Sequence, residues 1–350
     1  MLAEKAKAIV VIAGKKLVES GLIARTWGNI SCRIDEKQYA ITPSGRDYNT
    51  LKIDDIVIVN IEDLSYDGNI KPSSEKGIHA DIYKYRKDVN FIIHTHQLNA
   101  STISAVRENF TILNDTNKKL IGEKVVCADY GLPGTKKLRK GVVKAIEKSK
   151  SKAIILSHHG AVCMGEEYEE AFEVAFELEN ECCNYIQSYI SEHINEAINF
   201  NLSDEEKNLI SEKIIKCRYD INNIIFSNDE ILLSTSKLKT EIKPLLDDFA
   251  QICGISLKTI NFDKNNIETS LELMIKALKH RNVVLISGYG AICCGYNKSD
   301  AEAIEIVTKK QCKAYMFASA KDNLRYINPI ECGLMRFVYL KKYSKMIQGY

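Results

Sequence analysis

The sequence lacks the features that mark several large classes of protein. Only 5 of its 350 residues are proline, and it contains no low-complexity or proline-rich tract. Lys and Arg number 48 against 46 Asp and Glu, so the formal net charge of +2 carries no electrostatic signature of nucleic acid or of an anionic membrane as a partner. No apolar run approaches the roughly 18 residues that span a bilayer. These absences favour a folded cytoplasmic protein.

Two further absences concern the start of the chain and its cysteines. The apolar stretch in MLAEKAKAIVVIAGKK is too short and too interrupted to predict a signal sequence. The chain has 11 cysteines but no C-x-x-C motif. Two pairs, Cys182-Cys183 and Cys293-Cys294, are adjacent in sequence, and such neighbours suit neither a chelate nor a disulfide because they point in different directions. We therefore expect reduced cysteines that pack as small buried side chains.

What the chain does contain is an irregular alternation of helix and strand patterns. Apolar residues recur at helical spacing over residues 6–17 and, in a longer helix, over residues 171–186. Short buried strands are predicted at residues 91–96 and 153–158. This alternation indicates an α/β or α+β sandwich in which helices cover a sheet, and the length allows two domains.

A weak internal repeat divides the chain. Residues 152–185 align without gaps on residues 282–315, with eight identities where chance would give about two. Each segment predicts a buried strand, a glycine turn and an amphipathic helix. The second copy is incomplete, because it has no counterpart of roughly the first 90 residues. We expect one domain at residues 1–200 and a degenerate partial copy at residues 222–350.

Four of the seven histidines lie in two tight clusters. His94 and His96 alternate on a predicted strand, so their rings leave the same face roughly 7 Å apart, which suits two ligands of one metal ion. His158 and His159 end another strand, and only one of them can join the first two, since successive strand residues face opposite ways. Three imidazoles with an open position are typical of catalytic zinc. A hydrogen-bonded histidine pair at a strand end is the alternative.

Three small polar segments precede the histidines. Ser73, Ser74 and Glu75 open a predicted helix, where hydroxyl and backbone N–H groups can bind an anion such as phosphate. Plain helix capping is the alternative. The other segments are the turns GNIS at residues 28–31 and TPSG at residues 42–45, each of which would be an ordinary turn if it stood alone.

Together and in this order, these motifs resemble the class II aldolase/adducin family, the group of fuculose-phosphate aldolase and ribulose-phosphate epimerase. The resemblance covers residues 1 to about 190 and rests on four motifs in register. It implies a three-layer α/β/α sandwich around a mostly antiparallel sheet, followed here by a truncated second copy. It also implies Zn2+, or another divalent metal, held by three histidines: His94, His96 and His159.

The resemblance assigns the other site residues as well. The polar segments would hold the substrate phosphate through Gly28, Asn29, Ser44, Gly45, Ser73 and Ser74. Glu75 matches the acid/base glutamate, where epimerase relatives tend to carry aspartate, and this favours aldol cleavage. The implied protein is a zinc-dependent homo-oligomeric lyase that cleaves a phosphorylated sugar, a ketose 1-phosphate, to dihydroxyacetone phosphate and an aldehyde. We expect burial in a ligand-free site to raise the pKa of Glu75.

The chain departs from the family in its tyrosines and in its second copy. Family aldolases use a tyrosine from a neighbouring subunit, but no tyrosine lies between Val106 and Val126, so the proton donor to the aldehyde is unassigned. In the second copy, Tyr289 stands for His159 and NIIFSND replaces NFIIHTH. We expect this copy to be structural, or to complete the site in place of a neighbouring subunit. Its candidate donors are Tyr289, Tyr296, Tyr339, Tyr343 and Tyr350.

Two other functions are compatible with these residues. A dehydratase or epimerase acting on a related sugar phosphate would share the metal and phosphate residues. A non-catalytic interaction module similar to the adducin head would use neither. Such modules have lost the metal ligands, whereas this chain retains all three histidines and Glu75.

Overall fold

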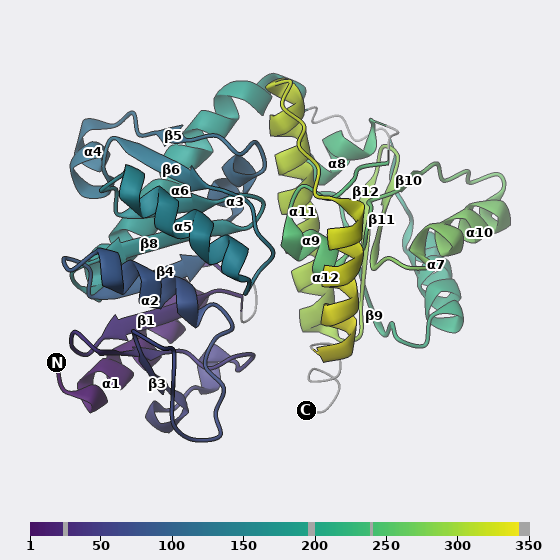
Figure 1. Cartoon of the computed structure of the whole chain (residues 1–350). Helices are drawn as coiled ribbons and strands as arrows, with labels where there is room; N and C mark the ends of the chain where they lie inside the picture. The colour runs from purple at the N-terminus through teal and green to yellow at the C-terminus, as the bar shows by residue number, and fades with distance from the viewer. Residues whose placement is uncertain (24–26, 195–199, 239–240, 343–350) are drawn as a thin grey trace. The chain divides into compact units, whose positions relative to one another are not determined.

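The computed structural model describes residues 1–23, 27–194, 200–238 and 241–342. The chain divides into two compact units, Met1–Ile186 and Gln187–Tyr350 (Figure 1). Among the described residues, no helix combines the length and the apolar character needed to cross a bilayer.

The first unit is built on one sheet. Its strands are β1 (Asn29–Arg33), β2 (Gln38–Ile41), β3 (Val57–Asn60), β4 (Phe91–Thr95), β5 (Phe110–Thr111), β6 (Lys124–Ala128), β7 (Ala153–Leu156) and β8 (Gly160–Gly165). They lie in the order β3-β2-β1-β4-β8-β7-β6-β5. The β6–β7 pair is parallel and the other neighbouring pairs are antiparallel, which confirms the predicted mostly antiparallel sheet.

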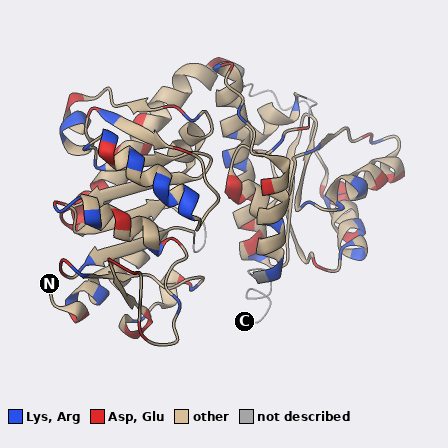
Figure 2. Cartoon of the chain, viewed as in Figure 1, with Lys and Arg blue, Asp and Glu red and all other residues tan. Residues whose placement is uncertain are grey.

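Helices cover both faces of this sheet (Figure 1). They are α1 (Ala3–Glu19), α2 (Lys76–Tyr85), α3 (Leu98–Ser104), α4 (Asp115–Ile121), α5 (Lys136–Lys148) and α6 (Tyr168–Ile190), with short helical turns at Tyr48–Thr50 and Ile53–Asp55. The end of α6 and the short helical turn Ser191–His193 belong to the second unit. α2 and α5 share one apolar core with the sheet. α1 packs on β1 and β2 on the opposite face, and α6 lies beside it, where Tyr168 contacts both Phe91 of β4 and Lys16 of α1, which completes the expected three layers. Lys and Arg gather along the outer side of α5, while its apolar side faces the sheet (Figure 2).

The predicted local elements of this unit are found with small shifts. The helix patterns at residues 6–17 and 171–186 lie within α1 and α6, and the buried strands are β4 and β7. The helix expected to open at Ser73 begins instead at Lys76, because Ser73 belongs to the preceding turn. There its Oγ atom accepts the N–H of Glu75 at 3.2 Å.

The second unit has a smaller sheet. Its strands are β9 (Asn223–Ser227), β10 (Thr259–Ile260), β11 (Val283–Ile286) and β12 (Gly290–Gly295), in the order β10-β11-β12-β9. Its helices are α7 (Asp204–Cys217), α8 (Glu230–Ser236), α9 (Asp247–Ile252), α10 (Ile267–Leu278), α11 (Lys298–Ala320) and α12 (Pro329–Lys342). α7 and α10 share an apolar core with β11 and β12. Ser203 and Glu206 form a capping box at the start of α7.

The two sheets follow the same order over four strands. The order β10-β11-β12-β9 corresponds to β6-β7-β8-β4, with a parallel first pair and antiparallel later pairs in each. Val283 pairs with Cys293 as Ala153 pairs with Cys163, 130 residues earlier. α6 and α11 each have 23 residues and start 130 residues apart. Among the described residues, the second sheet has no counterpart of β1, β2 or β3.

The cysteines lie mainly inside the two units. Eight of the eleven are buried and all eleven are free thiols. Burial raises the pKa of Cys294 to about 12, so its thiol stays protonated and unreactive at neutral pH. The expectation that the cysteines are reduced core residues is therefore confirmed for most of them, and Cys217 is the exposed exception.

Candidate functional site

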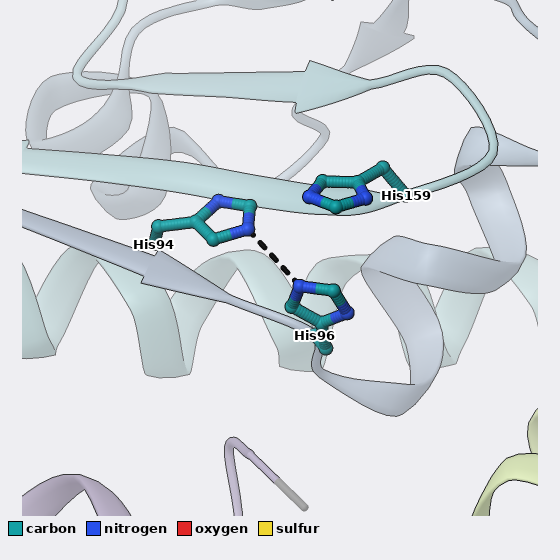
Figure 3. A group of neighbouring side chains, drawn as sticks. All are labelled: His94, His96 and His159. Atoms are coloured by element: carbon teal, nitrogen blue, oxygen red, sulfur yellow. Dashed lines mark hydrogen bonds between the residues drawn. The ribbon is translucent and has the colours of Figure 1, made fainter. Parts of the chain in front are cut away.

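Three of the four clustered histidines converge where the central strand β4 ends and β7 turns into β8 (Figure 3). The Nε2 atoms of His94 and His96 lie 3.1 Å apart. The ring of His159 lies 4.8 Å from that of His94 and 4.5 Å from that of His96, centroid to centroid. One nitrogen from each ring fits within a 4.8 Å span. The expected set of His94, His96 and His159 is thus brought together, more tightly than strand spacing alone suggested.

The backbone around this cluster requires two glycines. His94 is the last residue but one of β4, which pairs with β8, and His159 lies in the turn that joins β7 to β8. A Cβ atom on Gly160 would stand 2.1 Å from the carbonyl oxygen of Thr95. Gly28 has a φ of +116°, and a Cβ there would stand 2.5 Å from the carbonyl oxygen of His94. Both glycines therefore allow the close backbone contacts that bring the histidines together.

His158 faces away from the cluster as expected, but it lies in the turn after β7 and not in a strand, so strand alternation is not the cause. Its backbone adopts a φ of +62°, and its side chain is buried. The Nε atom of Arg107 donates to the Nε2 atom of His158 at 2.6 Å. The ring of Tyr130 meets the His158 ring edge-on at 5.2 Å. His158 thus belongs to a separate cluster and offers no ligand to the other three histidines.

Glu75 reaches the histidine cluster from the N-terminus of α2. Its Oε2 atom lies 3.3 Å from His94 Nε2, and its Oε1 atom lies 3.2 Å from His159 Nε2. Burial raises the pKa of Glu75, but attraction to the imidazoles, above all that of His94, outweighs burial and holds this pKa well below its ordinary value. The expected rise in pKa is therefore wrong, because the polar neighbours decide the direction.

The donor set fits a divalent metal ion. Burial lowers the pKa of His94 well below its ordinary value, so this imidazole stays neutral and keeps a lone pair for a metal. The Nδ1 atom of His94 is buried and has no hydrogen-bond partner among the described residues. Three imidazoles with a carboxylate at hand form a chemically suitable site for zinc or a similar cation.

The expected phosphate turns lie side by side. The N–H of Ser73 donates to the carbonyl oxygen of Thr42 at 3.0 Å, and the N–H of Ser44 donates to that of Lys71 at 2.9 Å. Ser74 and Gly45 are exposed and Ser44 is half-buried, whereas the buried Ser73 hydroxyl caps Glu75. The predicted segments thus form one accessible polar surface next to α2.

Asn29 and Gly28 occupy a different part of the site. The Nδ2 atom of Asn29 donates to Glu75 Oε2 at 3.1 Å, and its Oδ1 atom accepts from His79 Nε2 at 2.5 Å. The half-buried Gly28 accepts the phenol of Tyr48 through its carbonyl oxygen, at 2.6 Å. Asn29 therefore uses its amide to hold the carboxylate, a role that the sequence did not suggest.

Sequence reasoning missed two residues of this region. His79 follows Glu75 by one helical turn, and this spacing in the predicted helix was the available signal. Trp27 is the only tryptophan of the chain, and its ring lies 6.4 Å from that of His96.

Of the tyrosines in the second unit that were candidate proton donors, Tyr289 is buried and Tyr296 is exposed. Tyr339 lies in α12, and Tyr343 and Tyr350 fall outside the described residues.

Comparison with known proteins gives a family and named relatives. Residues 8–186 match the family model of the class II aldolase and adducin N-terminal domain. A 5-deoxy-D-ribulose 1-phosphate aldolase of Bacillus thuringiensis serovar kurstaki is 34% identical over 163 residues, which cover 46% of this chain and 75% of that protein. An L-fuculose phosphate aldolase of Methanocaldococcus jannaschii is 34% identical over 160 residues, which cover 45% of this chain and 82% of that protein. A solved L-fuculose 1-phosphate aldolase, 32% identical, aligns with a TM-score of 0.50 over 60% of this chain and 95% of that chain.

Proposed function

This chain belongs to the class II aldolase and adducin family, and from that premise we propose that it is a zinc-dependent lyase. It would cleave a ketose 1-phosphate into dihydroxyacetone phosphate and an aldehyde. The observation that carries this proposal is the position of Glu75, whose two carboxylate oxygens lie within 3.3 Å of two clustered histidines. A proton-transfer group beside a metal-ligand set is what carbon–carbon cleavage next to a carbonyl requires.

The roles of the residues follow from their chemistry. His94, His96 and His159 would hold the metal, which when bound supplies a Lewis acid for the carbonyl and hydroxyl oxygens of the sugar. In cleavage, the C3–C4 bond breaks and the C4 hydroxyl loses its proton as the aldehyde forms. Glu75 delivers a proton to C3, and it removes that proton in the synthetic direction. The proton lost at C4 balances the proton gained at C3.

The polar turns would bind the part of the substrate that does not react. Ser44 and Ser74 present hydroxyls at the accessible surface, and a Cβ on Gly134 would lie 3.7 Å from the Cβ of Ser74, so the loop before α5 borders the same place. The N-terminus of a helix favours an anion. Holding the phosphate lowers the entropic cost of placing C3 beside Glu75.

The experiment that tests this function is a substrate panel. Metal-loaded protein is incubated with the 1-phosphates of fuculose, rhamnulose, methylthioribulose and deoxyribulose, and release of dihydroxyacetone phosphate is measured. We expect release from at least one of them, and Ser44→Ala and Ser74→Ala to raise KM more than they lower kcat. An epimerised or dehydrated product in place of dihydroxyacetone phosphate would instead support the epimerase or dehydratase alternative.

A non-catalytic interaction module is the second alternative, and metal content separates it from an enzyme. Protein that is purified without metal and takes up none on reconstitution would favour the module. The cluster of His94, His159 and Glu75, all buried, with the half-buried His96 supports the enzyme, because unused polar groups of this kind would be costly to keep buried.

For the second unit, we propose a degenerate partial copy of the first, without a metal site. By strand register, Phe226 and Asn228 take the places of His94 and His96, and Tyr289 takes that of His159. None of these side chains is a common ligand of zinc. The copy either completes the site in place of a neighbouring subunit or serves in packing. A chain that ends at residue 221 distinguishes the two: loss of activity in a soluble, metal-loaded protein supports completion, and full activity supports packing alone.

A further inference from the structure

A buried line of polar side chains leads away from Glu75 through the interior of the first unit. Glu75, His79 and Tyr83 are spaced four residues apart along α2, so they share one face of the helix. Asn29 and Ser31 alternate on β1, so they share one face of the strand. These two rows meet between the helix and the sheet.

The contacts along this line are continuous. Asn29 Nδ2 lies 3.1 Å from Glu75 Oε2, and Asn29 Oδ1 lies 2.5 Å from His79 Nε2. His79 Nδ1 lies 2.6 Å from Ser31 Oγ, which lies 2.7 Å from the phenol oxygen of Tyr83. His79, Ser31 and Tyr83 are fully buried, and Asn29 is only 4% exposed. Solvent therefore does not compete for these hydrogen bonds.

The chemistry of the groups fixes the direction of every bond. A carboxylate only accepts, so Asn29 donates to Glu75 through its amide nitrogen. The amide oxygen of Asn29 then accepts, so His79 carries its proton on Nε2. The Nδ1 atom of His79 consequently accepts from the hydroxyl of Ser31.

The hydroxyl of Ser31 has then used its only proton, so its oxygen accepts from Tyr83. Burial also lowers the pKa of His79 to about 4, which agrees with a neutral ring that has one donor and one acceptor. All four donors therefore point toward the carboxylate of Glu75.

We propose that His79 is a positioning residue that sets the orientation of the Asn29 amide and, through it, of the Glu75 carboxylate. Without a donor at His79 Nε2, the buried amide oxygen of Asn29 would lose its partner, and rotation of the amide would turn that oxygen toward the carboxylate. Glu75 would then lose its donor and its fixed angle toward the substrate carbon. This inference rests on the proposed function of Glu75 in proton transfer.

Kinetics of the full-length, metal-loaded protein test the positioning role. We expect His79→Leu to lower kcat about 100-fold, as a displaced catalytic group does, with KM and metal content within about twofold of the wild type. His79→Gln places an amide nitrogen where Nε2 stood and is expected to recover most of the lost kcat. Wild-type kcat in His79→Leu would overturn the proposal, and so would His79→Gln with the same loss.

A pair of tyrosine variants separates positioning from stability. Tyr83→Phe removes the first donor of the hydrogen-bonded line and should lower kcat severalfold. Tyr39→Phe is the matched control. The phenol of Tyr39 is also buried and donates to α2, at the carbonyl oxygen of Lys76, but it is not part of the hydrogen-bonded line that leads to Glu75. We expect Tyr39→Phe to keep the wild-type kcat. Equal losses in both variants would mean that only helix packing is affected, which contradicts the proposal.

Nitrogen NMR of the imidazoles tests the direction of these hydrogen bonds without any substrate. Histidine labelled with 15N is incorporated, and the signals of His79 are identified by their loss in His79→Gln. We expect the tautomer with the proton on Nε2, and the opposite tautomer would overturn the chain of bonds. A wild-type protein with this tautomer that releases no dihydroxyacetone phosphate would instead overturn the proposed function alone.

Discussion

The rings of Trp27 and His96 are tilted by 39° with their centroids 6.4 Å apart, so the only tryptophan of the chain lies beside the candidate metal centre. Co2+ binds imidazole ligands as zinc does, and as a paramagnetic ion it quenches the fluorescence of a nearby indole. We predict that loading with Co2+ quenches the fluorescence of Trp27, because a metal ion on His96 would lie within a few ångströms of the indole. A fluorescence titration measures this, and His96→Ala should abolish the quenching. Stoichiometric Co2+ uptake without quenching would place the ion elsewhere.

The three clustered histidines should each be required for metal binding. We expect His94→Ala, His96→Ala and His159→Ala to lower metal content and abolish turnover, as measured by elemental analysis and by aldehyde release. His158→Asn is the control, because it alters the neighbouring buried histidine while asparagine tolerates a φ of +62°. This variant should retain its metal. Loss of metal in His158→Asn but not in His159→Ala would reverse the ligand assignment.

Removal of the carboxylate charge should separate binding from chemistry. Glu75→Gln keeps the shape of the side chain and an oxygen that can accept from Asn29, but it cannot transfer the proton. We predict that this variant binds metal and phosphate as the wild type does, while kcat falls by about 10²–10⁴. Isothermal titration and steady-state kinetics provide the two measurements. Full activity would remove Glu75 from the mechanism.

A pair of glycine variants should distinguish a close contact from backbone strain. Gly28 and Gly21 both have positive φ, but a Cβ on Gly28 would meet the carbonyl oxygen of His94 at 2.5 Å, whereas the space around Gly21 is open. Gly21→Ala should cost about 1–2 kcal/mol of unfolding free energy from strain alone. Gly28→Ala should cost more, on the order of 3 kcal/mol, and also weaken metal binding. Urea denaturation and metal affinity check both, and equal effects would contradict the predicted contact.

The burial of His79 should make the protein less stable in acid. The pKa of His79 is about 4 in the folded chain, against 6.5 for an ordinary histidine, so between these values the unfolded chain binds one more proton. Stability from this group is fully present above pH 6.5 and falls by up to about 3 kcal/mol as the pH drops through this window. Urea denaturation at pH 7, 5.5 and 4.5 measures the effect.

His79→Gln provides the comparison for this acid effect, since the other titrating groups are unchanged. The stability difference between wild type and variant should shrink as the pH falls. A constant difference would show that His79 titrates normally in the folded chain.

The comparison of sequence and structure separates local from long-range information. A short continuous apolar run located β4, and strand geometry alone then placed the alternate residues His94 and His96 on one face. Strand geometry allowed only one of His158 and His159 to join this pair, and the choice of His159 rested on the resemblance to the family. These inferences depend on a few adjacent residues, which is why they needed no tertiary structure.

The parts that the sequence could not provide depend on contacts between distant segments. Asn29 meets Glu75 across 46 residues and His79 across 50, so its role depends on how β1 packs against α2. The pKa of Glu75 was expected in the wrong direction because burial and neighbouring imidazoles act oppositely on it, and their balance depends on distances that no motif specifies. The start of α2 moved to Lys76 because a turn used the Ser73 hydroxyl.

The β7–β8 hairpin of the first unit and the β11–β12 hairpin of the second unit each carry a cysteine that can serve as a chemical probe of unfolding. Cys163 and Cys293 occupy the same position of β8 and β12, opposite the first residue of the preceding strand, and both thiols are fully buried. Burial raises the pKa of each far above that of a free thiol, so an alkylating reagent reaches either one only when its unit opens. Timed alkylation followed by peptide mass spectrometry would therefore measure the opening rate of each unit separately within the intact chain.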